Sequence, residues 1–165
     1  MKDFTDLDNV VNSLSNGAFL VSGNEKPNVM TVAWGAIGVM WFKPVLIIPV
    51  RQSRYTKEFI DKTGVFTLSV PFGNSMDDAL KYCGTHSGRD EDKIANAGLT
   101  LFPAKHINSH IVEGANMYYE CRVLYKSVID KERLQQEEAE CYVTNDMHTV
   151  YIAEIISSYS LPLEV

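Results

Sequence analysis

Residues 28–70 decide the fold, and they read NVMTVAWGAIGVMWFKPVLIIPVRQSRYTKEFIDKTGVFTLSV. Nearly continuous apolar runs over Asn28–Ile37 and Val45–Val50 predict two buried strands, and alternation over Gly64–Val70 predicts a third. Ser53–Lys62 lies between them with helical spacing and a glycine soon after it, which predicts a short helix. Connections this short favour an antiparallel barrel or sandwich over repeated βαβ units.

Glycine and proline mark irregular points in the first two of these strands. Gly35 and Gly38 interrupt the first strand, which is typical of a bulge or of a neighbour that approaches the backbone closely. Pro49 has no N–H to donate to a neighbouring strand, so it predicts an edge or a bulge in the second strand.

The rest of the chain continues the same mainly β pattern. In the strongest strand signal, Met117–Ile129, Tyr119 and Cys121 share an apolar face while Glu120 falls on the opposite, polar face. The charged run Asp130–Glu140 predicts a solvated loop or a short helix. The remaining predicted strands are Phe19–Ser22, Glu140–Val143 and His148–Ile156, and the remaining helices surround Met76–Cys83, stopped by Gly84, and Ile94–Ala97, capped by Asp90 and ended by Gly98.

Composition limits the class of protein. The chain has 165 residues, of which 45% are hydrophobic and 22% charged, so a single domain over residues 1–165 can bury a core. Fifteen basic residues against 21 acidic ones give a net charge of −6, which argues against nucleic acid or an anionic membrane as a partner. No apolar stretch is long enough to span a membrane, and the start of the chain lacks a secretory pattern. The expected location is the cytoplasm.

Cysteine and histidine positions argue against two kinds of site. The three cysteines are an odd number and include no Cys-x-x-Cys pair, so a disulfide framework is not expected. The four histidines are scattered along the chain, so we predict no metal site. They are His86, His106, His110 and His148.

The segment Arg51–Thr56 carries two arginines and two hydroxyls where a strand ends and a helix begins. Free backbone N–H groups and the helix dipole favour an anion there, and arginine adds charge-assisted hydrogen bonds. A phosphate monoester is the natural ligand for such a turn. The alternative is that Ser53 is only the N-cap of the helix and that the arginines are solvated.

Two further segments carry polar groups or small residues in unusual surroundings. Asn28–Gly35 combines polar side chains with a tryptophan and a glycine, which could line a slot for a flat heterocycle. The alternative is a core strand with a packed tryptophan. Tyr82–Asp90 is rich in small residues and permits close approach to a ligand, although no dinucleotide or P-loop motif occurs. Within it, Cys83 could be a nucleophile with His86 as its base, but a buried, inert cysteine is the simpler interpretation.

Taken together, these segments resemble the flavin reductase-like family, which binds FMN in a split β-barrel and includes flavoredoxin. The resemblance rests on NVMTVAWGAIGVMWFKPVLIIPVRQSRYTKEFIDKTGVFTLSVP, on YCGTHSGRDEDKIANAGL and on MHTVYIAEI, which occur in the family's order. It covers the chain from about Ser15 to Tyr159. It implies a six-stranded Greek-key antiparallel barrel with a few short peripheral helices, assembled as a homodimer with one FMN near each subunit interface.

The resemblance also implies which residues hold the FMN. The strand from Asn28 to Trp34 would follow the isoalloxazine ring, and the apolar stretch after it would narrow the substrate site or form the dimer contact. The turn at Arg51–Thr56 would hold the phosphate, the small-residue loop would border phosphate or ring, and Lys93 would reach the cofactor from the next helix. The implied cofactor-binding residues are Asn28, Val29, Met30, Thr31, Ala33, Trp34, Arg51, Ser53, Arg54, Tyr55, Thr56, Cys83, Gly84, Ser87, Gly88 and Lys93.

The implied activity is that of an FMN-dependent oxidoreductase that passes electrons from NAD(P)H to a flavin or another acceptor. Because FMN supplies the redox chemistry, no acid, base or nucleophile of the protein is expected to be catalytic. One alternative is an electron carrier with tightly bound FMN, whose acidic charge would suit a basic protein partner. Another is a barrel that binds a ligand without catalysis, against which the presence of both Arg51 and Arg54 argues.

Overall fold

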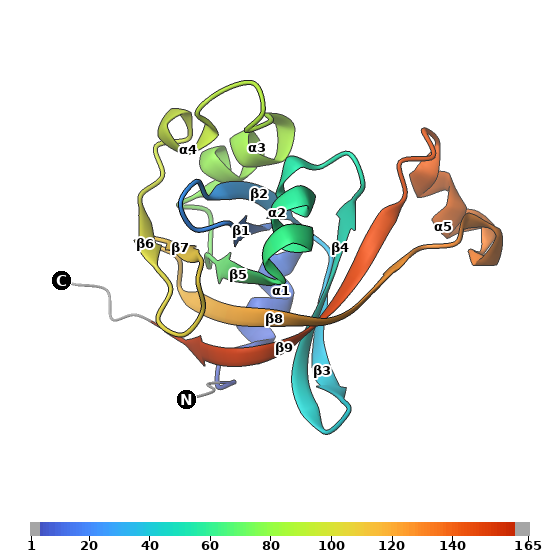
Figure 1. The fold of residues 1–165 in the computed structure, drawn as a ribbon, viewed down its shortest axis with the longest axis horizontal. Coiled ribbons are helices and arrows are strands. Elements are labelled where there is room, and N and C mark those ends of the chain that lie inside the picture. The colour runs from blue at the N-terminus through green and yellow to red at the C-terminus, as the bar shows by residue number, and fades with distance from the viewer. Residues whose placement is uncertain (1–3, 161–165) are drawn as a thin grey trace.

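The computed structural model describes residues 4–160 and consists of one large antiparallel sheet with short helices around it (Figure 1). The domain prediction covered residues 1–165, of which the first three and last five lie outside the described residues. Seven strands follow the order β2-β1-β5-β8-β9-β4-β3. They are β1 (Ala18–Ser22), β2 (Asn28–Val32), β3 (Ala36–Met40), β4 (Lys43–Arg51), β5 (Val65–Val70), β8 (Met117–Val128) and β9 (His148–Tyr159).

The sheet curls around one main core, so six of its strands form a barrel. Side chains from β1, β2, β4, β5, β8 and β9 all enter the same buried cluster, although β2 and β4 are not neighbours in the sheet. Val10 and Leu14 of helix α1 (Leu7–Leu14) fill one end of this cluster. The barrel is therefore split between β2 and β4, as the mainly β split-barrel prediction requires.

A second layer covers the outer face of β1 and β2. Phe19 and Val21 of β1 point away from the main core and pack with Leu80 and Val112 in a second cluster. These partners come from helix α3 (Asp77–Thr85) and from β7 (His110–Val112), which pairs with β6 (Leu101–Pro103), while α4 (Lys93–Asn96) lies beside them. Burial on both faces explains why most residues of these two strands are apolar.

The predicted strand Asn28–Ile37 is two strands, because the chain leaves the barrel at Ala33–Gly35 and then pairs with the far end of β4. A Cβ on Gly35 would lie 3.0 Å from the carbonyl oxygen of Ile47, which confirms the predicted close approach at that glycine. The prediction for Gly38 is wrong, since it lies in regular pairing with Val45 and no atom comes near. The sheet therefore has a seventh strand that the sequence pattern concealed.

Pro49 lies where β4 has a neighbour on one side only. Strand β3 pairs with β4 no further than Ile47, whereas β9 pairs with β4 up to Arg51. The predicted edge position of Pro49 is confirmed.

The predicted helices form, but three of their end assignments are wrong. Helix α2 (Tyr55–Thr63) has Arg54 rather than Ser53 at its N-cap, and Gly64 ends it in the left-handed conformation as predicted. Helix α4 is capped by Asp92 rather than Asp90, because the Asp92 carboxylate accepts the N–H of Ala95. Gly84 does not stop α3, which continues to Thr85.

The segment between β8 and β9 is helical and projects from the barrel (Figure 1). It contains η1 (Lys131–Arg133), α5 (Gln136–Ala139) and η2 (Glu140–Tyr142). The short helices fit the prediction for Asp130–Glu140, but the predicted strand Glu140–Val143 is wrong. That part of the chain has no strand to pair with, because β8 and β9 already pair with each other.

Glu120 was placed on a polar face, yet it is fully buried. Its two carboxylate oxygens accept the N–H groups of Lys105, His106 and Ile107 and the hydroxyl of Tyr159, at 2.7–3.1 Å. The carboxylate thereby fastens the loop after β6 to the middle of β8, and its burial is compensated by four donors.

Asp61 fastens helix α2 to the barrel. Its carboxylate accepts hydrogen bonds from Lys57 of α2, Lys126 of β8 and Tyr151 of β9, at 2.6–2.8 Å. Partial burial raises the pKa of Asp61, but these hydrogen bonds outweigh it and lower the pKa to about 2. The anchored helix places its N-terminus beside β2.

No helix within residues 4–160 has the length and apolarity to cross a bilayer.

We predict that the anchor at Asp61 makes stability depend on pH. Because the folded-state pKa lies below the unfolded value near 3.9, the carboxylate stabilises the fold above about pH 4 and loses this effect as the pH falls toward 2. Asp61→Asn should therefore lower the free energy of unfolding by about 2 kcal/mol at pH 7 and by much less near pH 2. Urea unfolding across this range checks it, with the exposed Glu113→Gln as control, and a loss of equal size at both ends would contradict it.

Candidate functional site

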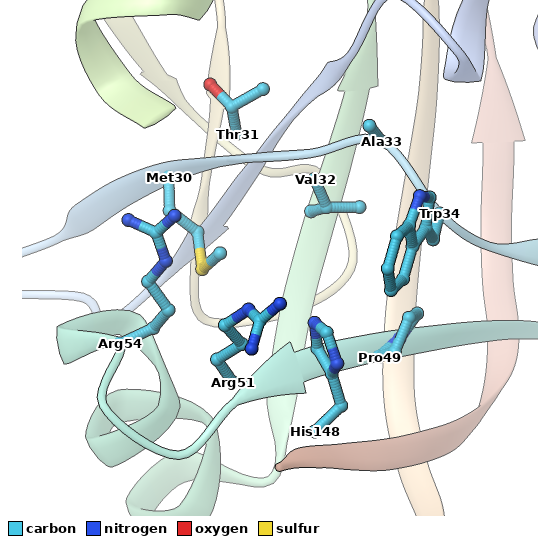
Figure 2. A pocket seen from close by; sticks show the side chains of 9 residues that line it. All are labelled: Met30, Thr31, Val32, Ala33, Trp34, Pro49, Arg51, Arg54 and His148. Atoms are coloured by element: carbon cyan, nitrogen blue, oxygen red, sulfur yellow. The ribbon is translucent and has the colours of Figure 1, made fainter. Parts of the chain in front are cut away.

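A hollow of about 160 Å³ opens along the split between β2 and β4, and we call it the Trp34 hollow (Figure 2). Residues 30–34 of β2 and its continuation form one wall, and β4 and the first residue of β9 form the other. Trp34 is 46% exposed and its ring lies 5.2 Å from that of His148. The lining residues are Met30, Thr31, Val32, Ala33, Trp34, Pro49, Arg51, Arg54 and His148.

His148 is buried at the edge of this hollow and is neutral at pH 7. Its Nδ1 is 2.8 Å from the hydroxyl of Tyr142. Burial, with the nearby charge of Arg51, lowers the pKa of His148 to about 4. The imidazole therefore offers one N–H donor and one acceptor rather than a positive charge.

Arg51 pairs with His148 across β4 and β9, and its guanidinium is already partnered. It donates to the carbonyl oxygens of Asp146, at 2.8 Å, and Cys141, at 3.1 Å, and it lies 5.4 Å above the ring centre of Tyr142. These contacts hold the Arg51 side chain at the Trp34 hollow.

The second hollow, of about 260 Å³, lies at the N-terminus of α2, and we call it the polar hollow. It shares Met30 and Arg54 with the Trp34 hollow, so the two form one elongated site. Arg54 lies between them and donates to the carbonyl oxygen of Gly84 at 2.9 Å. The residues that line the polar hollow are Asn28, Met30, Ser53, Arg54, Tyr55, Thr56, Thr85, His86, Ser87, Arg89, Asp90 and Lys93.

Lys93 places a buried amino group at the polar hollow. Its side chain is 4% exposed, and its Nζ donates to the carbonyl oxygens of Cys83, at 3.3 Å, and His86, at 3.1 Å. Burial lowers the pKa of Lys93. An ammonium group has three protons, so one donor is left for a ligand in the hollow.

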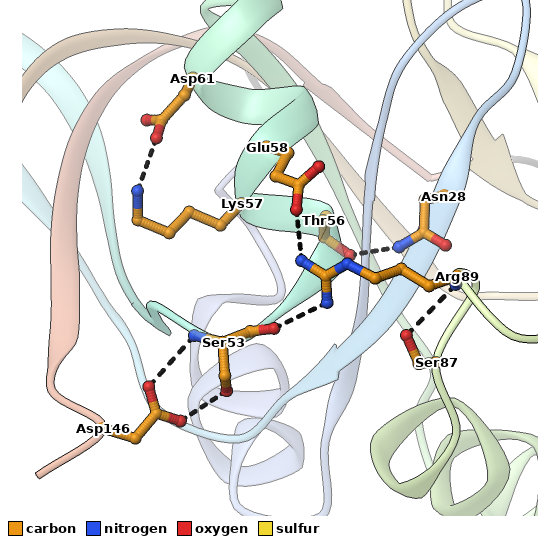
Figure 3. A network of polar contacts seen from close by, with 9 residues as sticks. All are labelled: Asn28, Ser53, Thr56, Lys57, Glu58, Asp61, Ser87, Arg89 and Asp146. Carbon is orange, nitrogen blue, oxygen red and sulfur yellow. Dashed lines mark hydrogen bonds and ion pairs between the residues drawn. The ribbon is translucent and has the colours of Figure 1, made fainter.

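Ser53 is engaged by a residue 93 positions away (Figure 3). Its backbone N–H donates to one carboxylate oxygen of Asp146 at 3.1 Å, and its hydroxyl donates to the other at 2.5 Å. The carboxylate occupies the kind of position that an anion would take at this turn. The proposed N-cap role of Ser53 is therefore wrong, since its side chain bonds to Asp146 instead of the helix.

Arg89 links the small-residue loop to α2 (Figure 3). It donates to the carbonyl oxygen of Ser53 at 3.0 Å, forms an ion pair with Glu58 and lies 4.8 Å over the ring of Tyr55. A Cβ on Gly88 would fall 2.0 Å from the Asn28 side-chain oxygen, so any larger residue there would displace the Asn28 side chain. The loop consequently lies directly against the start of β2.

The sixteen predicted site residues divide into those that line the elongated site and those that do not. Twelve of them line the elongated site, and Asn28 is held there by a 2.7 Å hydrogen bond to Thr56. Four line neither hollow. Val29 and Cys83 are fully buried in the second core cluster, and burial raises the pKa of the Cys83 thiol to about 11, which favours the inert interpretation. Gly84 contributes its carbonyl oxygen, which accepts a hydrogen bond from Arg54, and Gly88 packs against the side chain of Asn28.

Seven residues that line the elongated site were not among the predicted cofactor-binding residues, namely Val32, Pro49, Thr85, His86, Arg89, Asp90 and His148. Asp146, which bonds to Arg51 and Ser53 beside the site, was not predicted either. His148 lies in MHTVYIAEI and Arg89 in YCGTHSGRDEDKIANAGL, so both belong to the segments that carry the family resemblance. Asp146 lies in an unremarkable loop and gave no signal.

No cluster of three metal-ligating side chains occurs within residues 4–160.

The elongated site fits a flat ring that carries a phosphate. The Trp34 hollow supplies an aromatic and apolar surface, and the polar hollow supplies Arg54, Arg89 and Lys93 beside a helix N-terminus. Together the two hollows exceed the volume of about 300 Å³ at which ligand pockets begin.

Comparison with known proteins agrees with this geometry. A protein of uncharacterized function from Archaeoglobus fulgidus is 34% identical over 138 residues, which are 83% of this chain and 67% of that protein. The flavoredoxin of Desulfovibrio vulgaris (Miyazaki F) superposes with a TM-score of 0.69 at 26% identity over 88% of this chain and 69% of that one. An FMN-binding domain of a flavin reductases-like enzyme from Shewanella baltica OS155 superposes with a TM-score of 0.65 at 24% identity, over 93% and 74%.

A family model described as flavin reductase like domain matches residues 11–160, which is most of the sequence. With the split barrel and the elongated site at its opening, this match shows that the chain belongs to the flavin reductase-like family.

Proposed function

We propose that the chain binds FMN in the elongated site and works as an oxidoreductase of flavin reductase type. It would pass electrons from NAD(P)H to a flavin or another acceptor. A bound FMN would supply the redox chemistry by accepting and releasing electrons. The observation that carries the proposal is the joining of an aromatic hollow to a hollow with three cationic side chains, in a chain of this family.

The cationic end of the site would hold the phosphate. Arg54, Arg89 and Lys93 line it, and the first N–H groups of α2, those of Tyr55 and Thr56, have no carbonyl within their own helix. Ser53 and Arg51 were also expected at the phosphate. Ser53 is bonded to Asp146, and Arg51 lies outside the polar hollow, so we assign the phosphate to the three cations that line this hollow and place Arg51 beside the ring.

The aromatic end of the site would hold the ring. Met30 and Val32 offer apolar contact from β2, and Trp34 closes the far end of the hollow. Arg51 and His148 line the opposite wall and place their polar nitrogen atoms at the hollow (Figure 2). Neutral His148 and buried Cys83 are unsuited to acid–base or nucleophilic work at pH 7, which agrees with chemistry supplied by a cofactor.

The first test is binding of FMN and riboflavin to the purified chain, followed by the visible spectrum. Arg54→Met should weaken FMN binding by about tenfold or more, because it removes a charge-assisted contact to the phosphate, and should change riboflavin binding little. Arg133→Met, at an exposed position in η1, is the matched control. A chain that binds no FMN, or an Arg54→Met variant that loses both ligands equally, would contradict the proposal.

The similarity to flavoredoxin favours a second candidate, an electron carrier that is reduced by a protein partner. Rapid mixing of the FMN-loaded chain with NADH and with NADPH separates the two candidates. We expect bleaching of the flavin absorbance by at least one nucleotide on the timescale of turnover. Bleaching only after addition of a reduced protein donor would favour the carrier.

We also propose that the chain functions as a homodimer whose contact includes the β3–β4 hairpin. Val39, Trp41 and Phe42 are exposed at 75%, 54% and 103%, which is unusual for large apolar side chains that sit together. Trp41 and Phe42 also form the two-residue turn with φ of 50° and 58°, a strained conformation that glycine or asparagine normally adopts. A strained apolar turn at the end of a projecting hairpin is suited to insertion into a partner surface (Figure 1).

Phe42→Glu should therefore shift the chain from dimer to monomer, measured as molar mass by light scattering after size exclusion. Val143→Glu places the same charge at another exposed apolar side chain, at 85% exposure, and should leave the dimer intact. A wild-type chain that is monomeric at micromolar concentration would refute the dimer.

A further inference from the structure

The inference concerns the two ring nitrogens of His148, which have different surroundings. Nδ1 contacts the hydroxyl of Tyr142 at 2.8 Å, whereas no hydrogen bond joins Nε2 to any of residues 4–160. Nε2 is nevertheless not sealed from solvent, although His148 as a whole is only 7% exposed. Since His148 lines the Trp34 hollow, Nε2 is reached from that hollow (Figure 2).

The hydroxyl of Tyr142 determines which nitrogen carries the proton. Tyr142 is 4% exposed, burial raises its pKa, and the only acceptor that its hydroxyl contacts among the described residues is Nδ1. If Nδ1 carried the proton, the buried phenol proton would have no acceptor. If Tyr142 donates to Nδ1 instead, both groups are satisfied and the proton of the imidazole lies on Nε2, at the hollow.

Tyr142 is held rigidly enough to act in this way. Its ring lies 5.4 Å from that of His148 at 82°, and the guanidinium of Arg51 covers its face. Its carbonyl oxygen accepts a hydrogen bond from Lys131 Nζ at 3.1 Å. Asp146, four residues later, accepts a hydrogen bond from the backbone N–H of Ser53. The segment between β8 and β9 therefore places the Tyr142 hydroxyl against Nδ1 of His148. Contacts to Lys131 and Ser53 hold this segment before and after Tyr142.

We propose that Tyr142 is a positioning residue that fixes His148 as the Nε2–H tautomer, so that His148 donates a hydrogen bond to an acceptor atom at the edge of the flat ring in the Trp34 hollow. This inference rests on the proposed function for the identity of the ring. The pyrimidine edge of a flavin carries two carbonyl oxygens and one unprotonated ring nitrogen, which are acceptors of the required kind. No catalytic proton transfer is assigned to either residue.

The first experiment uses the ligand-free chain. Nitrogen-15 chemical shifts of the His148 imidazole distinguish a protonated Nε2 from a protonated Nδ1 at pH 7, where the ring is neutral. We expect the Nε2–H tautomer in the wild type and a mixture of both in Tyr142→Phe, which removes only the hydroxyl. Tyr118→Phe is the matched control, because it deletes another buried hydroxyl, bonded to the Ala115 carbonyl oxygen far from the site. A wild-type Nδ1–H tautomer would overturn the proposal.

The second experiment measures riboflavin binding, since riboflavin presents the ring without the phosphate. Tyr142→Phe should weaken it by about two- to tenfold, because only the fraction of His148 that remains as the Nε2–H tautomer can donate to the ring. His148→Gln supplies an amide donor that does not depend on Tyr142, so Tyr142→Phe should have no further effect in that background. An equal loss in both backgrounds would mean that Tyr142 only supports the segment, and would overturn the proposal. Failure of the wild type to bind any flavin would refute the proposed function, and the tautomer measurement would still decide the part played by Tyr142.

Discussion

The incomplete closure of the barrel between β2 and β4 is the constraint on which the rest of the structure depends. The two strands share a core through Met30, Val32, Leu46 and Ile48, yet they are not paired in the sheet. The chain can leave β2 at Ala33–Gly35 because Gly35 has no side chain, whereas a Cβ there would lie only 3.0 Å from the carbonyl oxygen of Ile47. A fully paired barrel would have no edge at this point and no room for a ligand. The Trp34 hollow is the direct consequence of the missing pairing.

The polar side chains around this opening divide into those already satisfied and those still available. Arg51 and Ser53 are bonded to the segment before β9, and Asp146 stands where an anion would otherwise bind. Lys93 is buried with two carbonyl acceptors, so its charge is only partly compensated and an added anion would lower its desolvation cost. Under the proposed function, the partly compensated charge of Lys93 therefore favours the polar hollow as the phosphate end of the site.

Local patterns in the sequence predicted the elements well and the long-range contacts poorly. Alternation and apolar runs located β4, β5, β8 and β9, because each is set by burial of its own side chains. The division into β2 and β3 was missed, since both halves are apolar and only the pairing with β4 separates them. The alternation places Glu120 on the polar face and does not reveal its burial, because no local pattern shows that a distant loop will supply three N–H donors. The bond from Ser53 to Asp146 was invisible for the same reason.

The segment between β8 and β9 illustrates how a poorly predicted region can complete a well-predicted site. The motifs around Trp34 and Arg54 were evident in the sequence, but neither fixes the far wall of the hollow. That wall depends on Tyr142 and Asp146, which reach Arg51 and His148 from a projection outside the barrel. None of its residues belongs to the main core cluster, and its contacts to the site are few and polar. Under the proposed function, the barrel would determine where the ring binds, and this projection would determine which hydrogen bonds the ring accepts from His148.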